Sequence, residues 1–173
     1  MKDIKPHFYK RLYVAPSKIS GNGLFAGEDI CKGEIILSFG GMLASTDERN
    51  SDKYISSTYS GIAETIMICE SSDSVKDFSD YINHSCEPNV GMDDCITLRA
   101  ISEIEEGTEL LCDYAFWEAD CNWVLRNQCN CGSIHCRRSI TGKDWMKVSS
   151  QNPMFQFYSP FLQRRIIQHE KKT

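Results

Sequence analysis

Short runs of apolar residues, separated by turn residues, recur over most of the chain. The clearest run is Cys95–Ala100, in which Ile96, Leu98 and Ala100 fall on one face, as they do in a half-buried strand. Comparable runs rich in β-branched and aromatic residues predict further strands at residues 11–15, 24–26, 34–39, 65–69 and 109–114, with a shorter one near Tyr54. The pattern therefore predicts a mostly β fold built from short strands.

Helical signals are confined to two places. Ser159 and Pro160 have the residue types of an N-cap and a first-turn proline, and they predict a last helix that ends near His169. Residues 115–128 have room for one short helix, while the polar residues 1–10 carry no clear signal. We therefore expect few helices, all of them short.

The length of 173 residues suits a single domain, and a chain of this size buries roughly 70% of its unfolded surface. No apolar run approaches the ~20 residues of a membrane-spanning helix, so no membrane association is expected. The chain begins without the basic start, long apolar core and cleavage site of a secretory signal. We expect an intracellular protein of the cytoplasm or nucleus, although an effector exported without a classical signal would share these features.

The net charge of −5 and the pI near 5.4 argue against direct nucleic-acid binding, which depends on clustered lysines and arginines. An acidic surface suits a basic protein or peptide partner instead. The oligomeric state is left open by the sequence.

Nine cysteines form an odd and large set, which argues against a closed disulfide framework. Three of them lie within the eight residues Cys129–Cys136, with Gly132 at the turn between them. Zinc prefers four soft ligands in a tetrahedron, so a fourth ligand must come from elsewhere. Cys86, His135 and Cys121 are the candidates, and a redox-active cluster is the alternative. The five scattered cysteines are expected to be mainly packing residues; they are Cys31, Cys69, Cys95, Cys112 and Cys121.

The stretch Tyr81–Asn89 combines amides, an imidazole, a hydroxyl and a thiol, and Pro88 bars an ordinary helix there. Loops of this composition usually serve a binding or catalytic site. Asn83 also begins a glycosylation sequon. Farther upstream, residues 21–26 match the dinucleotide pattern G-x-G-x-x-A, but Gly27 and Gly33 break the helix that such a site requires.

Four stretches together resemble the SET-domain protein lysine methyltransferases in order and spacing. They are Ser20–Ala26, Asn83–Asn89, Glu109–Tyr114 and the cysteine run, which follows where the family's post-SET zinc segment lies. The resemblance covers about residues 8–140 and implies a SET domain at 8–115, a post-SET zinc segment at 116–140 and a C-terminal extension at 141–173. It also implies small sheets and a C-terminal pseudoknot.

The resemblance implies roles for individual residues. It assigns Tyr114 to the active site, a single zinc ion to Cys86, Cys129, Cys131 and Cys136, and S-adenosylmethionine to Gly21, Asn22, Gly23, Asn83 and His84, with Tyr54 as a looser addition. With Cys86 as a zinc ligand, the loop directs Asn83 inward, so the match to the glycosylation sequon is expected to be coincidental.

The chemistry of Tyr114 can be argued independently of the family. Methyl transfer to lysine needs a neutral, aligned amine, whereas a free lysine has a pKa of about 10.4. An apolar channel beside a cationic sulfonium lowers that pKa by desolvation and like charge. Tyr114 is then expected to orient the amine, with the proton lost to solvent.

Two positions depart from the family pattern. Cys112 stands where the family usually has Phe or Tyr, and the smaller side chain predicts room for di- or trimethylation unless Phe116 or Trp117 fills the space. Asp80 stands where an arginine is frequent. Phe39, Phe116 and Trp117 are candidates for lining the lysine channel.

The sequence thus predicts a lysine methyltransferase that acts on a histone or another basic protein. A catalytically silent SET-like binding module and a small zinc-dependent structural protein are the alternatives.

Overall fold

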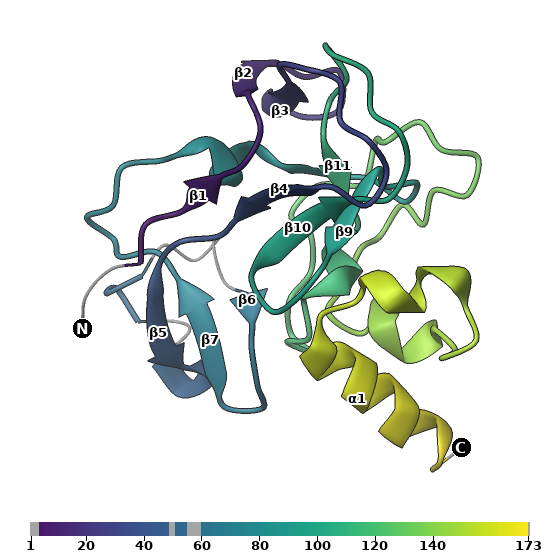
Figure 1. The fold of residues 1–173 in the computed structure, drawn as a ribbon. Helices are drawn as coiled ribbons and strands as arrows, with labels where there is room; N and C mark the ends of the chain where they lie inside the picture. Colours follow the sequence, from purple (N-terminus) through teal and green to yellow (C-terminus); the bar gives the residue numbers. More distant parts are fainter. Residues whose placement is uncertain (1–3, 49–50, 55–59, 173) are drawn as a thin grey trace.

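The computed structural model describes residues 4–48, 51–54 and 60–172. These residues form three small sheets, five 3₁₀ helices and one α-helix (Figure 1). The largest sheet has the order β1-β4-β10-β9-β11-β8. Its strands are β1 (His7–Phe8), β4 (Ile35–Ser38), β8 (Asn83–His84), β9 (Val90–Met92), β10 (Thr97–Ala100) and β11 (Leu111–Cys112).

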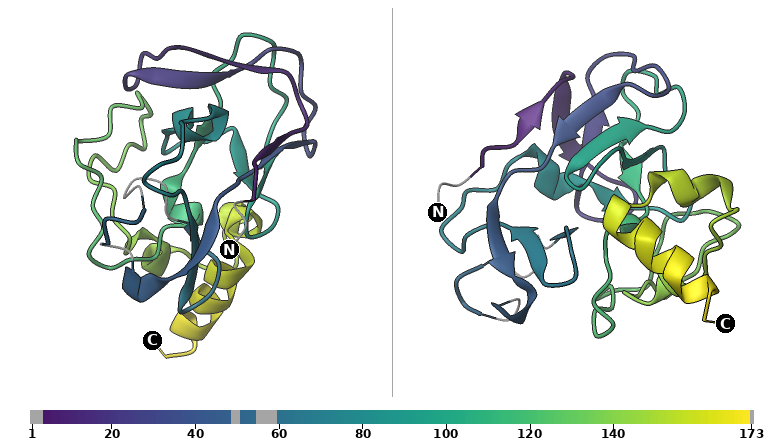
Figure 2. Two further views of the ribbon diagram at one scale, coloured as in Figure 1. Left: turned by 90° about the vertical axis from the view of Figure 1, so that its left-hand side faces the viewer. Right: turned by 60° about the horizontal axis from the view of Figure 1, so that its bottom comes forward.

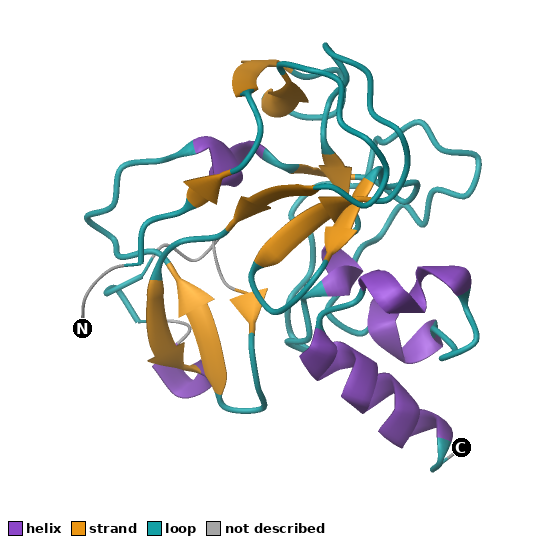
Figure 3. Cartoon of the chain, in the orientation of Figure 1, coloured by secondary structure: helices purple, strands orange, loops and turns teal. Residues whose placement is uncertain are grey.

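Two smaller sheets flank the largest one, as Figure 3 shows. Strands β2 (Leu12–Pro16) and β3 (Asn22–Ala26) form an antiparallel hairpin, in which Pro16 lies opposite Asn22. The other sheet has the order β5-β7-β6, with β5 (Met42–Ser45), β6 (Ser60–Gly61) and β7 (Ile66–Cys69). The hairpin turn is therefore formed by Ser17–Gly21, where the Ser17 N–H donates to the Gly21 carbonyl at 2.8 Å.

Strand β11 lies between β8 and β9 and runs parallel to both, although β8 and β9 follow each other in the sequence. Leu111 is opposite Asn83, and Cys112 is opposite both His84 and Val90. A late strand inserted between two consecutive earlier strands is what the expected pseudoknot requires. The predicted fold, mostly β with several small sheets and few short helices, is confirmed.

The C-terminal segment is part of the main core and is no loose appendage. Helix α1 (Pro160–Glu170) begins at the N-cap Ser159, whose hydroxyl accepts a hydrogen bond from the Leu162 N–H at 3.4 Å. Its apolar face buries three residues against the sheet core, together with several from the preceding 3₁₀ helices: Trp145, Phe157, Tyr158, Phe161, Leu162 and Ile166. Figure 2 shows α1 beside the strands in both views. The last helix was predicted correctly.

The structure differs from the sequence predictions at several short elements. In place of a helix within residues 115–128 there is only a 3₁₀ turn at Tyr114–Phe116, capped by Asp113. Tyr54 forms a single bridge to Ser71 and no strand. Strands β1, β5, β6, β8 and β9 were not predicted, because two to four residues give no readable period. Among the described residues, no helix is long and apolar enough to span a bilayer.

Candidate active site and metal centre

The structure brings four cysteines together from distant parts of the chain. The Sγ atoms of Cys86, Cys129, Cys131 and Cys136 all lie within 4.8 Å of one another. Tetrahedral zinc with Zn–S bonds of about 2.3 Å separates its sulfur ligands by about 3.8 Å, so the cluster fits this ion. Within the described residues, His135 and Cys121 are not part of this group. Cys86 is therefore the geometrically suited fourth ligand.

The thiols of the cluster have unequal acidity. Burial raises the pKa of Cys86 and of Cys129. Burial also opposes ionisation of Cys131, but hydrogen bonds from the backbone N–H groups of Cys86 and Ser133 and from the thiols of Cys129 and Cys136 together lower the Cys131 pKa to about 6. Zinc binds thiolates, so ligation by the set would release protons from the thiols.

Asn83 fastens the turn between β2 and β3. Its side-chain Nδ2 donates to the carbonyl oxygens of Ser20 and Asn22, both at 3.1 Å, and to Oε1 of Glu109 at 2.8 Å. The other carboxylate oxygen of Glu109 accepts from the Ser17 hydroxyl at 3.0 Å. One carboxylate thus holds both the amide and the start of the turn.

The glycines of this turn have distinct structural reasons. Gly21 has a φ of +49°, and a Cβ there would meet nothing within 4 Å, so its backbone faces open space that a ligand can approach. A Cβ at Gly23 would collide with Oε1 of Glu109. The turn therefore offers exposed backbone at Gly21 and Asn22 beside the Asn83 amide, while Gly23 is buried; the expected cofactor contacts of these residues stay a prediction.

The imidazole of His84 lies between Tyr114 and the cysteine cluster. Its Nδ1 accepts the Tyr114 backbone N–H at 3.2 Å, so Nε2 carries the proton and donates to Cys86 Sγ at 3.4 Å. Burial lowers the His84 pKa to about 4, against an opposing effect of Asp113. The ring is therefore neutral at neutral pH, and any direct contact of His84 with a ligand falls to its backbone.

Tyr114 is anchored at both ends. Its hydroxyl donates to the Ile82 carbonyl at 2.8 Å, which leaves the phenol oxygen able to accept a further hydrogen bond. Burial raises the Tyr114 pKa, so the phenol stays protonated. Trp117 and Trp123 lie beside it, with ring centroids 5.5 and 6.2 Å away. Trp123 was missed in the sequence because it follows the motif without periodic spacing.

The other aromatic candidates separate into two groups. Phe39 contacts Trp117 at 5.8 Å between centroids, so these two extend the aromatic group around Tyr114. Phe116 is 1% exposed and packs edge-on against Tyr158 in the core. Its role in a lysine channel stays a prediction, as does that of the fully buried Cys112.

Tyr54 and Asp80 lie in separate surroundings. Tyr54 packs against a small second cluster of Ala44, Met67 and Cys69, and its expected contact with a cofactor stays a prediction. Asp80 completes a capping box in the 3₁₀ helix Phe78–Tyr81, where its Oδ2 accepts the backbone N–H of the N-cap Asp77 at 2.8 Å. Burial raises the Asp80 pKa.

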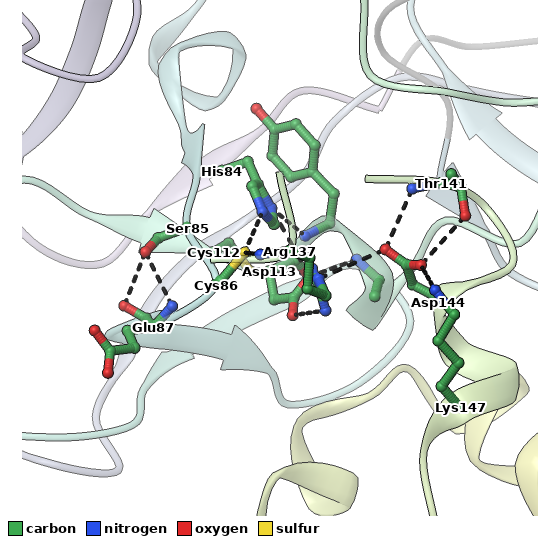
Figure 4. Close-up of polar contacts among 12 residues, drawn as sticks. His84, Ser85, Cys86, Glu87, Cys112, Asp113, Arg137, Thr141, Asp144 and Lys147 are labelled. Atoms are coloured by element: carbon green, nitrogen blue, oxygen red, sulfur yellow. Dashed lines mark hydrogen bonds and ion pairs between the residues drawn. The ribbon is translucent and has the colours of Figure 1, made fainter. Parts of the chain in front are cut away.

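An ion-pair network built on the buried carboxylates of Asp113 and Asp144 (Figure 4) begins at the residue that precedes Tyr114. Asp113 accepts the Ala115 N–H at 2.9 Å and pairs with the Arg137 guanidinium. Asp144 accepts from the Thr141 N–H at 3.2 Å and pairs with Lys147 at 2.9 Å. Burial opposes ionisation of Asp144, but these donors together lower its pKa. The network was not predicted, because the sequence spacing of such partners carries no signal.

A cleft of about 400 Å³ lies between the β5-β7-β6 sheet, residues 119–122 and α1. Its wall carries the carboxylates of Asp47, Glu64 and Asp120, and Arg165 pairs with Glu64 at 3.0 Å. Gly61, also in the wall, lies against the Trp117 carbonyl. The wall of the cleft therefore carries three carboxylates and one guanidinium, so the cleft is acidic.

Comparison with known proteins matches residues 21–115 to the SET domain family model. The histone-lysine N-methyltransferase trr of Drosophila melanogaster is 33% identical over 151 residues, which are 79% of this chain and 6% of that protein. Human histone-lysine N-methyltransferase 2B is 33% identical over 142 residues, 73% of this chain and 5% of that one.

A chain in the crystal structure of an active polycomb repressive complex 2 in the basal state superposes with a TM-score of 0.53 and 29% identity. The match covers 61% of this chain and 15% of that chain. The chain thus spans only a small part of the length of each of these relatives.

Proposed function

Because the chain belongs to the SET-domain family, we propose that it is a protein-lysine N-methyltransferase that uses S-adenosylmethionine. The observation that carries this proposal is the meeting at Asn83–Cys86 of three features. Asn83 fastens the open glycine turn, His84 binds the backbone of Tyr114, and Cys86 joins the cysteine cluster. A purely structural zinc protein would need neither the fastened glycine turn nor the contact between His84 and Tyr114.

The chain's own residues have separable roles in this proposal. Gly21, Asn22 and Gly23, with Asn83 and His84, hold the cofactor, which supplies the electrophilic methyl group when bound. Tyr114 stays neutral and orients the substrate amine through its free lone pair. The aromatic side chains around Tyr114, which are Phe39, Trp117 and Trp123, exclude water and favour binding of the substrate alkylamine.

The four cysteines hold one structural zinc ion in this proposal. Their geometry and soft donor atoms support it. Residues 8–115 form the SET domain, 116–140 the zinc segment and 141–173 the extension, which the core contacts of α1 join to the domain.

The acidic cleft supports a basic substrate segment around the target lysine. The relatives named as histone-lysine methyltransferases support a histone as that substrate, which would place the activity in the nucleus. The small Cys112 at the channel position supports di- or trimethylation. Mass spectrometry that detects only monomethyl product would contradict this last point.

The decisive experiment incubates the chain with methyl-labelled S-adenosylmethionine and mixed core histones. We expect label on lysine, and a loss of at least about a hundredfold in rate for Tyr114→Phe with cofactor affinity unchanged, because the orienting hydroxyl is missing. Cofactor binding without any label would support the silent module instead. Zinc chelation that leaves fold and cofactor binding intact would contradict the zinc site.

A further inference from the structure

Arg137 lies where three separate parts of the chain meet (Figure 4). Its Nη1 and Nη2 donate to Oδ2 and Oδ1 of Asp113 at 2.8 and 2.6 Å. Its Nε lies 3.6 Å from Oδ2 of Asp144, and its backbone N–H donates to Cys86 Sγ at 3.4 Å. One residue thus contacts the end of strand β11, the C-terminal segment and the cysteine cluster.

The burial of these groups distinguishes them from an ordinary surface ion pair. The side chains of Asp113 and Asp144 are 8% and 0% exposed, and that of Arg137 is 28% exposed. Exposed pairs contribute little because water screens them. A buried carboxylate that loses its cation, in contrast, keeps an uncompensated charge and must move or take up a proton. Asp113 depends on Arg137 in this way, whereas Asp144 also has Lys147.

Asp113 in turn sets the start of the turn that carries the active-site tyrosine. It is the N-cap of the 3₁₀ helix Tyr114–Phe116, and its Oδ1 accepts the Ala115 N–H. The same Oδ1 accepts from Arg137 Nη2. A shift of the Asp113 carboxylate would therefore move the backbone at Tyr114, which is held on its other side by His84 Nδ1.

The guanidinium suits this role because its planar fork engages both oxygens of Asp113 at once. A lysine ammonium would supply the charge without the fixed geometry. Arg137 immediately follows the cluster residue Cys136. Its contacts with Asp113 and Asp144 therefore require that residues 136–144 follow their observed path.

Building on the proposed methyl transfer, we propose that Arg137 is a positioning residue that fixes Asp113 and the Tyr114 turn. It does so only when the cysteine cluster and the segment around Asp144 are in place. The geometry of the catalytic tyrosine then depends on the two segments that follow strand β11. Arg137 needs no contact with substrate in this role.

The test compares Arg137→Gln with Arg138→Gln, which removes the same charge from the exposed neighbouring residue. We expect the kcat of methyl transfer to fall at least about tenfold in Arg137→Gln, because small misplacements at a reacting centre are costly. The cofactor Kd should change less than about twofold, as for an interaction that acts on the catalytic step. Arg138→Gln should retain the wild-type kcat.

A second readout is independent of turnover. The backbone amide signals of Tyr114 and Ala115 should shift in the NMR spectrum of Arg137→Gln and stay in place in that of Arg138→Gln. If the wild-type chain transfers no methyl group, the proposed function fails, yet these amide shifts still decide the positioning role.

Arg137→Lys separates charge from geometry and serves in place of Arg137→Gln if that variant does not fold. We expect it to recover only a small part of the lost kcat and to retain the amide shifts. Unchanged kcat in a folded Arg137→Gln, unshifted amides, or full activity of Arg137→Lys would each overturn the proposal. An equal loss of kcat and cofactor affinity would indicate a general structural defect and would overturn it as well.

Discussion

Glu109 is the residue on which the glycine turn depends most directly. Its two carboxylate oxygens accept from Asn83 and Ser17, and its position leaves room only for a glycine at residue 23. In Glu109→Gln the amide oxygen can face Asn83 only if the NH₂ group faces the Ser17 hydroxyl. The Ser17 oxygen already accepts the Ile19 and Ser20 N–H groups, so this arrangement weakens the contact. We expect the Kd for S-adenosylmethionine to rise about tenfold, the size of one lost charged hydrogen bond.

Isothermal titration calorimetry measures this effect directly. Glu106→Gln is the matched control, because it is an exposed residue in the loop before the same stretch. Equal cofactor affinity for Glu109→Gln and wild type would remove Glu109 from the cradle.

His84 gives a prediction about pH. Its pKa of about 4 in the folded state lies below the value near 6.5 of an unfolded histidine, so the folded state binds its proton less readily. The contribution of this residue to stability is therefore complete above about pH 6.5 and is lost as the pH falls toward 4. The Cε1 resonance of His84 should show no titration between pH 7.5 and 5. A midpoint at or above 6 would contradict the lowering of the His84 pKa by burial.

At the scale of elements, alternation predicted β10, a run of apolar residues predicted β7, and the N-cap pattern predicted α1. Strand β8 was missed for a physical reason. Asn83 and His84 are poor strand formers, but β11 pairs with them in parallel, and tertiary pairing overrides their preference. The same limit applies to β9, which contains Gly91.

The cysteine cluster connects the loop that contains Cys86 with the distant run Cys129–Cys136. The variant Cys86→Ser tests that connection. The Cys86 sulfur accepts from the Arg137 N–H and from His84 Nε2, so a hard and shorter hydroxyl would disturb both contacts. We expect weaker zinc retention on dialysis, measured by elemental analysis, and a weaker cofactor Kd. Cys31→Ser is the control, because Cys31 is exposed and outside the cluster. A variant that kept full affinity for zinc and cofactor would disprove the link.

At the scale of the whole molecule, the sequence predicted the residues that carry local patterns and missed those that act through distant partners. The cysteines of the run at 129–136 are recognisable by spacing alone. In contrast, Arg137 meets Asp113 and Asp144 only after the chain folds, and the acidic cleft combines residues from four separate segments. Contacts between residues that are distant in the sequence leave no local periodicity, so ion pairs and clefts of this kind could be identified only in the structure.

The cleft leads to a prediction about substrate recognition. Asp47→Asn combined with Asp120→Asn removes two negative charges from its wall without changing side-chain size. We expect the KM for a basic histone peptide to rise about fivefold, since partly exposed charges contribute modestly, while kcat stays nearly constant. The wild-type KM should rise with added salt and that of the double variant much less, because screening acts on the charges that were removed.

The matched control is Asp73→Asn, an exposed carboxylate outside the cleft. It should leave KM and its salt dependence unchanged. A substrate peptide whose flanking arginines are replaced by glutamine should reproduce the effect of the double variant on wild-type enzyme, and the two changes together should add little. If the double variant binds the basic peptide as well as wild type at low salt, the cleft does not receive the substrate, and the basic segment must lie along another surface.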